Sequence, residues 1–213
     1  MAVERTDSET SLTVQVWRRL RGDILAGALA PASKLKVSDL SARYDAGASP
    51  IREALSQLAA ERLVEKLDNR GFRVAPASTE EFTDIVKARC WLEAAALRDS
   101  LANADETWED ALIVAFHRLD RAERSHSTWE THHRRFHGAL LAACTSTTTL
   151  AYCGELYDRA IRYRRIARTN ARSARDVARE HQAIFEAAVA READRAVTLL
   201  LEHYRTTSST LVL

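Results

Sequence analysis

Residues that interrupt helices are scarce in this chain of 213 residues, which has three prolines and six glycines. No proline follows Pro76, and beyond it only Gly138 and Gly154 remain. The part after Pro76 is dominated by alanine, leucine and arginine and shows no convincing alternation of apolar and polar residues. Good helix formers without proline favour helix. We therefore expect the second half to be almost entirely helical.

Cysteine and long apolar runs are also scarce. An odd number of cysteines, Cys90, Cys144 and Cys153, embedded in apolar helical patterns, indicates buried thiols rather than a disulfide framework, which fits a reducing cytoplasm. Residues 1–10 are polar and mixed in charge, and no run approaches the ~18 apolar residues of a membrane-spanning helix. We expect a soluble cytoplasmic protein with a flexible tail at 1–10 and no membrane partner.

Neither sign of charge dominates the whole chain, with 31 Lys and Arg against 30 Asp and Glu. The distribution is uneven, because residues 11–76 hold eleven basic and seven acidic side chains, whereas residues 77–213 hold nineteen and twenty. A basic excess confined to one part of a chain is typical of a nucleic-acid-binding domain. The N-terminal third is therefore the part expected to contact DNA.

The stretch SPIREALSQLAAERLVEKLDNRGFRVAP, residues 49–76, predicts a helix followed by a two-stranded wing. Ser49 suits an N-cap and Pro50 suits the first helical position. A 3.6-residue period separates a packed side from an outward side. The packed side holds Ile51, Leu55, Leu58 and Arg62, and the outward side holds Ser49, Arg52, Glu53 and Ser56.

The wing consists of LVEKL, the turn Asp68-Asn69-Arg70-Gly71 and FRVA. By itself, the stretch also fits an amphipathic helix beside a hairpin in an α+β domain. The preceding segment favours a helix-turn-helix, because residues 37–44 form a short amphipathic helix and residues 45–48 a glycine-containing turn. The helix that starts at Ser49 is the recognition helix of this motif. Before the motif, apolar residues every four positions predict a helix that ends at Gly27 and packs under the recognition helix; they are Leu12, Val16, Leu20 and Ile24.

The segments LRGDILAGALAP, KLKVSDLSARY, SPIREALSQLAAERLVE and NRGFRVAP resemble the N-terminal domain of the GntR family of bacterial transcription regulators, over about residues 12–78. REAL, a leucine-rich turn and NRG together are similar to the FadR-like branch, in which a helical effector domain, the FCD domain, follows. One departure is Ala48, where the family usually has Arg. The resemblance implies a winged helix-turn-helix at 11–76 and an effector domain at 79–209.

A mainly α fold is thus expected, with an N-terminal winged helix-turn-helix followed by an all-α six-helix ligand-binding bundle. Ser49, Pro50 and Arg52 should face the bases in the major groove, while Arg70 and Gly71 approach the backbone or the minor groove. One such domain makes few contacts, so a homodimer on a palindromic operator is expected. The six helices are expected at about 79–102, 106–123, 127–143, 147–168, 172–190 and 192–209.

All seven histidines lie after residue 116, and four of them form a pattern. His133 and His137 stand four apart, on one side of a helix. His181 and His203 are equidistant from residue 192, where the turn of a helical hairpin is expected, so they should face each other. Four imidazoles brought together predict a metal site. The alternative is that each histidine is an ordinary surface or core residue.

The FCD resemblance implies metal ligands at His137, His181 and His203, with His133 where the family commonly has Asp or Asn. A set of four imidazoles favours Zn²⁺ or Ni²⁺ over Mn²⁺ or Mg²⁺. The resemblance also implies a small carboxylate effector held by the metal and by cationic side chains. Arg89 in ARCWLE is the first candidate and Arg162 in IRYRR the second, while an ion pair of Arg89 with Glu93 is the alternative for Arg89.

These features together predict a metabolite-responsive, DNA-binding transcription repressor that binds a divalent metal and a small carboxylate. The resemblance of the whole chain to FadR-like regulators, particularly in GASPIREALSQLAAERLV, implies a small dicarboxylate or hydroxy acid as the effector. The alternatives are a metalloenzyme that uses the four histidines and a regulator that senses the metal itself. The enzyme is the weaker alternative, because the sequence has no HExxH motif, no Ser/His/Asp ordering and no glycine-rich phosphate loop.

Overall fold

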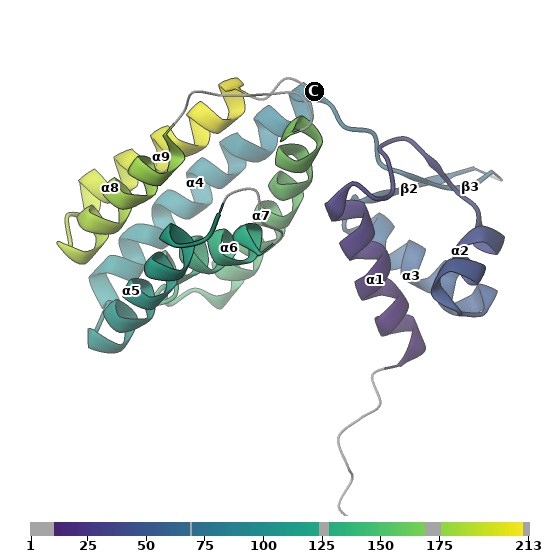
Figure 1. Cartoon of the computed structure of the whole chain (residues 1–213), viewed down its shortest axis with the longest axis horizontal. Helices are drawn as coiled ribbons and strands as arrows, with labels where there is room; N and C mark the ends of the chain where they lie inside the picture. Colours follow the sequence, from purple (N-terminus) through teal and green to yellow (C-terminus); the bar gives the residue numbers. More distant parts are fainter. Residues whose placement is uncertain (1–10, 69, 124–127, 169–175, 211–213) are drawn as a thin grey trace, which may run out of the picture. The chain divides into compact units, whose positions relative to one another are not determined.

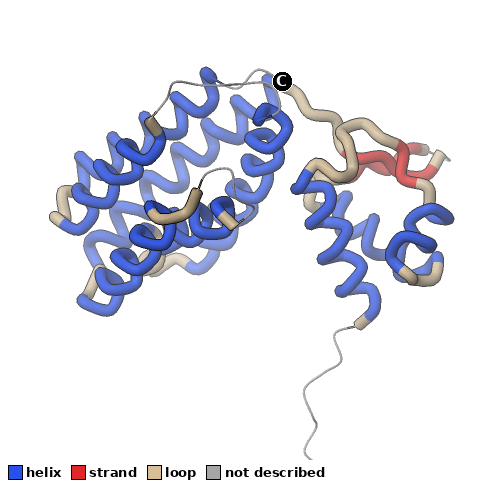
Figure 2. The backbone as a smooth tube through the Cα atoms, in the orientation of Figure 1, coloured by secondary structure: helices blue, strands red, loops and turns tan. Residues whose placement is uncertain are grey.

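The structure is a computed structural model that describes residues 11–68, 70–123, 128–168 and 176–210. The chain divides into two compact units, one ending at Ser78 and the other beginning at Thr79 (Figure 1). The described strands all belong to the first unit, and the second unit is built from helices (Figure 2). Each unit has its own hydrophobic core, and each is described below by itself.

The first unit is a winged helix-turn-helix. Its three strands form an antiparallel sheet in the order β1-β3-β2, in which Val64 pairs with Val74 and Leu35 pairs with Phe72. The sequence predicted the hairpin but not β1, because two residues are too few to show alternation. The elements are α1 (Leu12–Ala26), β1 (Lys34–Leu35), α2 (Val37–Tyr44), α3 (Ala48–Ala60), β2 (Val64–Leu67) and β3 (Gly71–Val74).

Helices α1 and α3 pack against each other through their apolar sides. The positions predicted to lie on the packed sides of both helices are buried, with two exceptions. Leu12 is 47% exposed at the start of α1. Arg62 does not share the packed side of α3, because it lies beyond the helix end, has a φ of 58° and is exposed. The buried residues are Val16, Leu20, Ile24, Ile51, Leu55 and Leu58.

The start of α3 differs from the predicted cap. The helix begins at Ala48 with Gly47 as its N-cap, so Ser49 and Pro50 both lie within the first turn. Pro50 is still compatible with helix there, because the first N–H groups of a helix have no intrahelical acceptor. The turn from α2 into α3 passes through Asp45, which has a φ of 52°.

The second unit contains a long helix, α4, that packs against α7 and α9, while α5 packs against α6 and α8 (Figure 1). Helices α8 and α9 form an antiparallel hairpin. The helix expected at 127–143 is shorter than predicted, and part of the one expected at 172–190 lies outside the described residues, as does Asn69 of the wing. The bounds are α4 (Thr79–Asn103), α5 (Glu106–Asp120), α6 (Trp129–Leu140), α7 (Thr147–Arg168), α8 (Val177–Val189) and α9 (Ala193–Thr210).

The cysteine prediction is confirmed, because Cys90, Cys144 and Cys153 are free and buried. Burial raises the pKa of the Cys153 thiol to about 12. Among the helices of the described chain, none is both long and apolar enough to cross a bilayer.

The C-terminus of α1 supplies a stability test. Gly27 has a φ of 79° and its N–H donates to the carbonyl of Ile24, so Gly27→Ala should destabilise the protein by about 1 kcal/mol. Gly22 is exposed inside the same helix with no atom within 4 Å of an added Cβ, so Gly22→Ala should stabilise by up to ~1 kcal/mol. Urea unfolding of both variants measures the two effects. Changes of the same sign would contradict the assigned helix end.

Candidate metal centre and DNA-contacting surface

The four predicted histidines meet in one buried cluster. His133 and His137 come from α6, His181 from α8 and His203 from α9, and each is at most 4% exposed. One ring nitrogen from each residue lies within 4.8 Å of those of the other three. The Nε2 atoms of His133 and His137 are 3.1 Å apart. Zinc bound by four imidazoles separates the nitrogens by about 3.4 Å, so the cluster is close to the size of a tetrahedral site.

Local structure explains how the four side chains meet. The spacing of four residues places His133 and His137 on the same side of α6. The turn between α8 and α9 lies at residues 190–192 and includes Arg191 with a φ of 58°. The rings of His181 and His203 are therefore neighbours across the hairpin, with centroids 4.7 Å apart.

A chain of hydrogen bonds leads away from His133. Its Nδ1 lies 2.6 Å from the hydroxyl of Tyr157, which donates to Glu130 at 3.2 Å. Arg164 donates to the same carboxylate oxygen of Glu130 at 2.5 Å. Because the Tyr157 hydroxyl gives its hydrogen to Glu130, its oxygen can accept the Nδ1–H of His133. His133 then presents the lone pair of Nε2 to the cluster.

A second series of hydrogen bonds leads away from His137, again from histidine to tyrosine, glutamate and arginine. Its Nδ1 lies 3.0 Å from the hydroxyl of Tyr204, which donates to Glu93 at 2.5 Å. Arg89 donates from Nε to the other oxygen of Glu93 at 2.6 Å. The same reasoning places the hydrogen of His137 on Nδ1 and leaves Nε2 as an acceptor. Outer hydrogen bonds of this kind orient histidine ligands in metal sites.

His203 is oriented more directly, because its Nδ1 lies 2.7 Å from a carboxylate oxygen of Glu180. Burial lowers the pKa of both His133 and His137 well below the usual value, and nearby positive groups, first Arg164 for His133, lower it further. These two imidazoles are therefore neutral near pH 7, as metal ligation requires. Burial likewise raises the pKa of Tyr204, so its hydroxyl stays protonated and able to donate.

Arg89 forms the ion pair with Glu93 that was the alternative at this position. The side chain is 2% exposed, and its guanidinium lies 4.1 Å from the ring centroid of Tyr204. Burial disfavours its charge, but Glu93 and the tyrosines outweigh this, so the pKa of Arg89 lies above its usual value. Its Nη2 is buried and has no hydrogen-bond partner among the described residues.

Arg162, the second effector candidate, is also buried on α7. The hydrogen-bond chain of His133 uses Arg164 instead. The sequence interpretation missed Glu130, Tyr157, Tyr204 and Arg164. The position of Glu130 three residues before His133 was a usable signal, whereas the tyrosines depend on the packing register of α7 and α9.

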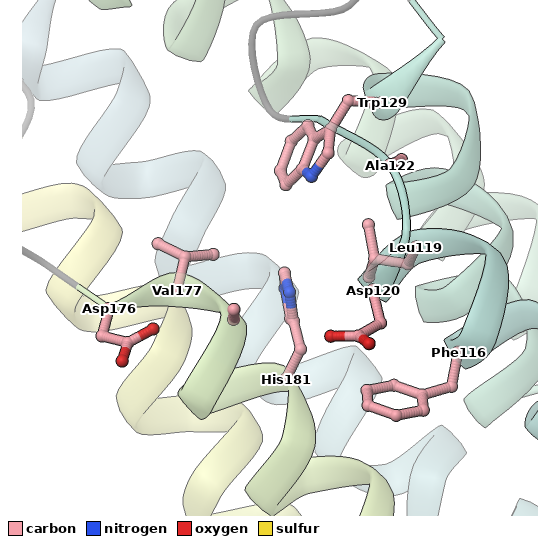
Figure 3. A pocket seen from close by; sticks show the side chains of 9 residues that line it. Phe116, Leu119, Asp120, Ala122, Trp129, Asp176, Val177 and His181 are labelled. Atoms are coloured by element: carbon pink, nitrogen blue, oxygen red, sulfur yellow. The ribbon is translucent and has the colours of Figure 1, made fainter.

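Two cavities adjoin the cluster. One of about 210 Å³ is lined by His181 on α8, Trp129 on α6 and Phe116 on α5, and Figure 3 shows these rings around it together with the carboxylate of Asp120. The other, of about 110 Å³, lies beside His137. The lining of this second cavity also includes Glu93, Arg134, Cys153 and Tyr157. The volumes of both cavities suit small molecules only.

The predicted DNA-contacting residues lie on the surface of the first unit. Ser49 and Arg52 are exposed on α3, and Pro50 between them is half-buried. Arg70 and Gly71 are exposed where the hairpin turns into β3, and Gly71 has a φ of 91°. The recognition helix and the wing therefore both present a basic side chain to solvent.

Comparison with known proteins agrees with this architecture. Residues 84–206 match the FCD domain, and residues 12–74 match the family of bacterial regulatory proteins named gntR. The chain belongs to the GntR family. Members with this pair of domains are DNA-binding transcription regulators and not enzymes, which excludes the metalloenzyme alternative.

Two relatives match this GntR chain along most of their length. The uncharacterized HTH-type transcriptional regulator BphR of Paraburkholderia xenovorans (strain LB400) is 39% identical, over 93% of this chain and 84% of the relative. The HTH-type transcriptional repressor GlaR of Escherichia coli (strain K12) is 36% identical, over 92% and 94%.

Solved structures confirm the fold. E. coli McbR/YncC has a TM-score of 0.78 at 19% identity, covering 94% of this chain and 96% of that one. A putative transcriptional regulator GntR from Rhodococcus sp. RHA1 has a TM-score of 0.76 at 24% identity, covering 94% and 97%.

The buried ion pair gives the second prediction. Glu93→Gln leaves the buried Arg89 without its counter-charge, and we expect a loss of about 3–5 kcal/mol in the free energy of unfolding. The matched control is Glu192→Gln, which removes an exposed pair with Arg195 and should change stability by less than ~0.5 kcal/mol. Denaturant unfolding measures both. Equal effects would show that burial does not make the Arg89–Glu93 pair critical.

Proposed function

We propose that this GntR regulator is a cytoplasmic homodimeric repressor whose operator binding is controlled by a divalent metal ion in the four-histidine cluster and by a small carboxylate effector. The observation that carries the proposal is the arrangement of four buried imidazoles, of which His133 and His137 direct acceptor nitrogens at each other across 3.1 Å. Two lone pairs at that distance repel unless a proton or a cation lies between them. A metal ion is the occupant that also engages His181 and His203.

The donor set supports Zn²⁺ or Ni²⁺. Four neutral imidazoles without a carboxylate suit borderline ions better than Mn²⁺ or Mg²⁺. The counter-charges Glu93, Glu130 and Glu180 lie one hydrogen bond or one tyrosine away from the histidines. A bound metal would act as a Lewis acid toward a carboxylate oxygen of the effector, while these residues keep the imidazoles oriented.

Arg89 supports the effector part of the proposal. The buried Nη2 of Arg89 is a donor without a partner among the described residues. Arg89 lies near the histidine cluster, because Glu93 contacts both Arg89 and Tyr204, and Tyr204 contacts His137. A carboxylate is the group that such a guanidinium binds best. The adjoining cavities limit the effector to a small metabolite, such as a dicarboxylate or hydroxy acid. Arg162 remains the second candidate for contacting it.

A regulator that senses the metal itself is a second candidate function. Four protein ligands fill a tetrahedral site, whereas a site that must also bind a ligand usually keeps one position open. The two functions differ in what changes operator affinity. A metal sensor responds to Zn²⁺ or Ni²⁺ alone, whereas an effector-responsive repressor changes its operator affinity only when the small acid is added to the metal-loaded protein.

On the DNA side, we propose base contacts from the Ser49, Pro50 and Arg52 end of α3 and backbone or minor-groove contacts from Arg70 and Gly71. The exposure of Ser49, Arg52 and Arg70 on one compact unit supports this. GlaR, the 36% identical relative, is named a repressor, which supports repression over activation.

The third prediction tests the metal. Purified protein should carry about one Zn²⁺ or Ni²⁺ per chain by elemental analysis, and zinc at a hundredfold excess over Kd should stabilise the fold by about 2.7 kcal/mol. His181→Ala should abolish this stabilisation. His133→Asp should retain a site but shift preference toward Mn²⁺. His132→Ala is the control, because His132 lies on the same helix outside the cluster.

A second pair of variants tests the hydrogen-bond chains. Tyr204→Phe should weaken metal binding by about 10–100-fold, because it removes the group that orients His137. Tyr163→Phe is matched, because Tyr163 is also buried and donates to a glutamate, Glu81, outside the cluster. The metal site would be contradicted if the purified parent protein contained no metal and the histidine variants melted at the same temperature as the parent. The four histidines would then be ordinary polar core residues.

The fourth prediction concerns DNA. Arg52→Ala should cost about 1–3 kcal/mol in specific operator binding if Arg52 makes a bidentate guanine contact. Arg70→Ala should weaken binding evenly across sequences and lower the salt slope by about one unit if Arg70 contacts phosphate. Arg195→Ala, an exposed arginine of the second unit, is the control. Unchanged footprints for Arg52→Ala would contradict the recognition-helix assignment.

A further inference from the structure

The outer side of α4 carries an unusual exposed residue. Trp91 is 66% exposed, the largest exposed fraction among the big apolar side chains of the described residues. Asp84 and Arg98 lie seven residues before and after it, and both are exposed. Seven residues make almost two full turns of helix, so the three side chains lie on one line along α4. An acid, an indole and a base are therefore aligned and equally spaced on this surface.

The surroundings of Trp91 are small or charged. Lys87 and Ala95, four residues before and after, are exposed, and the ammonium of Lys87 lies 5.0 Å from the ring centroid of Trp91. The opposite side of α4 faces the core, with Arg89 and Glu93 among its buried residues. Although α7 and α9 both pack against α4, they leave the line from Asp84 to Arg98 uncovered.

We propose that this line is where two copies of the chain associate, with the α4 helices antiparallel about a two-fold axis at Trp91. The inference deepens the proposed homodimer and rests on it. In such a pair, residues equally distant from the axis lie opposite each other. Asp84 of each copy then meets Arg98 of the second copy, and Lys87 meets the small Ala95. The indole of Trp91 packs on its own counterpart.

Charge decides the direction of the pair. If the two helices ran parallel about a two-fold axis, Asp84 would face Asp84 and Arg98 would face Arg98, which is repulsive at both ends. The antiparallel arrangement converts both contacts into attractive pairs. Arg98 already donates to Asp194 at 2.6 Å, and because the Arg98 side chain is 51% exposed, its guanidinium can also donate to a second carboxylate.

Helix α5 offers a rival surface. Val114 is 47% exposed there, with Asp110 four residues before it and Arg118 four residues after it. Four residues overshoot one turn by about 40°, so these side chains diverge from the line through Val114. Valine also buries less area than tryptophan, and tryptophan is the more frequent anchor of interfaces. The α4 surface is therefore the better match to a second copy.

The first experiment compares Trp91→Glu with Val114→Glu in the full chain. Sedimentation equilibrium over a range of concentrations measures the dimer Kd, and thermal unfolding checks that each variant is folded. We expect Trp91→Glu to raise the Kd by about 100-fold or more, since a central tryptophan is lost from both copies. Val114→Glu should leave the Kd within about threefold of the parent, because surface substitutions outside an interface have small effects.

Charge exchange and cross-linking test the geometry. Asp84→Arg and Arg98→Asp should each weaken the dimer, and the double variant should recover most of the loss, because each pair is rebuilt with its charges exchanged. A residue on a two-fold axis faces itself, so Trp91→Cys should form a disulfide-linked dimer on mild oxidation, whereas Val114→Cys should not. No recovery in the double variant would overturn the antiparallel register.

The outcomes separate this inference from the proposed function. A parent chain that sediments as a monomer at every concentration overturns the homodimer and this surface together. A parent dimer that persists in Trp91→Glu, or that dissociates in Val114→Glu instead, overturns the α4 surface while the proposed homodimer stands.

Discussion

The second unit depends on two buried glutamates that each hold a tyrosine and an arginine. Glu93 and Glu130 lie in the core of a helical bundle, where an unpaired carboxylate would be strongly destabilising. Each accepts hydrogen bonds from an arginine and a tyrosine, and each tyrosine oxygen then meets an imidazole. The histidine cluster is thus supported from outside by charge pairs that the bundle must form in order to fold. Fold and site are consequences of the same hydrogen bonds.

Helix α6 is short, but it contributes more residues to this hydrogen-bond network than its length would suggest. It supplies Glu130, His133 and His137, three members of the network, from consecutive turns of one side. The partners come from other helices, with Tyr157 on α7 and Tyr204 on α9. Under the proposed function, a carboxylate that binds Arg89 would act on Glu93, Tyr204 and His137 in succession. This connection would give the proposed effector a physical route to the histidine cluster.

Much of the fold could be predicted from the sequence, because the period of apolar residues and the residues that end helices or form turns are local properties of the chain. The apolar stripe of α1, its stop at Gly27, the hairpin and the helical second half were all predicted, and four histidines were placed together from the spacing of two helices and one turn. Strand β1 was not predicted because two residues are too few to show a period. The N-cap of α3 was placed at Ser49 because serine before proline is a typical helix start, whereas the actual N-cap, Gly47, makes no side-chain hydrogen bond. The roles of Tyr157 and Tyr204 were not predicted, because they depend on how helices that are distant in the sequence are rotated against each other.

Strand β1 has a consequence for the DNA-binding unit. Its two residues join the chain just before α2 to β3 of the hairpin, with Leu35 opposite Phe72 and both side chains buried. The hairpin is thereby connected to the helix-turn-helix through the pairing of β3 with β1, in addition to its covalent connection to α3. The angle between hairpin and recognition helix is set before any duplex arrives, so little conformational freedom remains to be lost on binding. A two-residue strand thus preorganises the hairpin and the helix that are proposed to contact DNA.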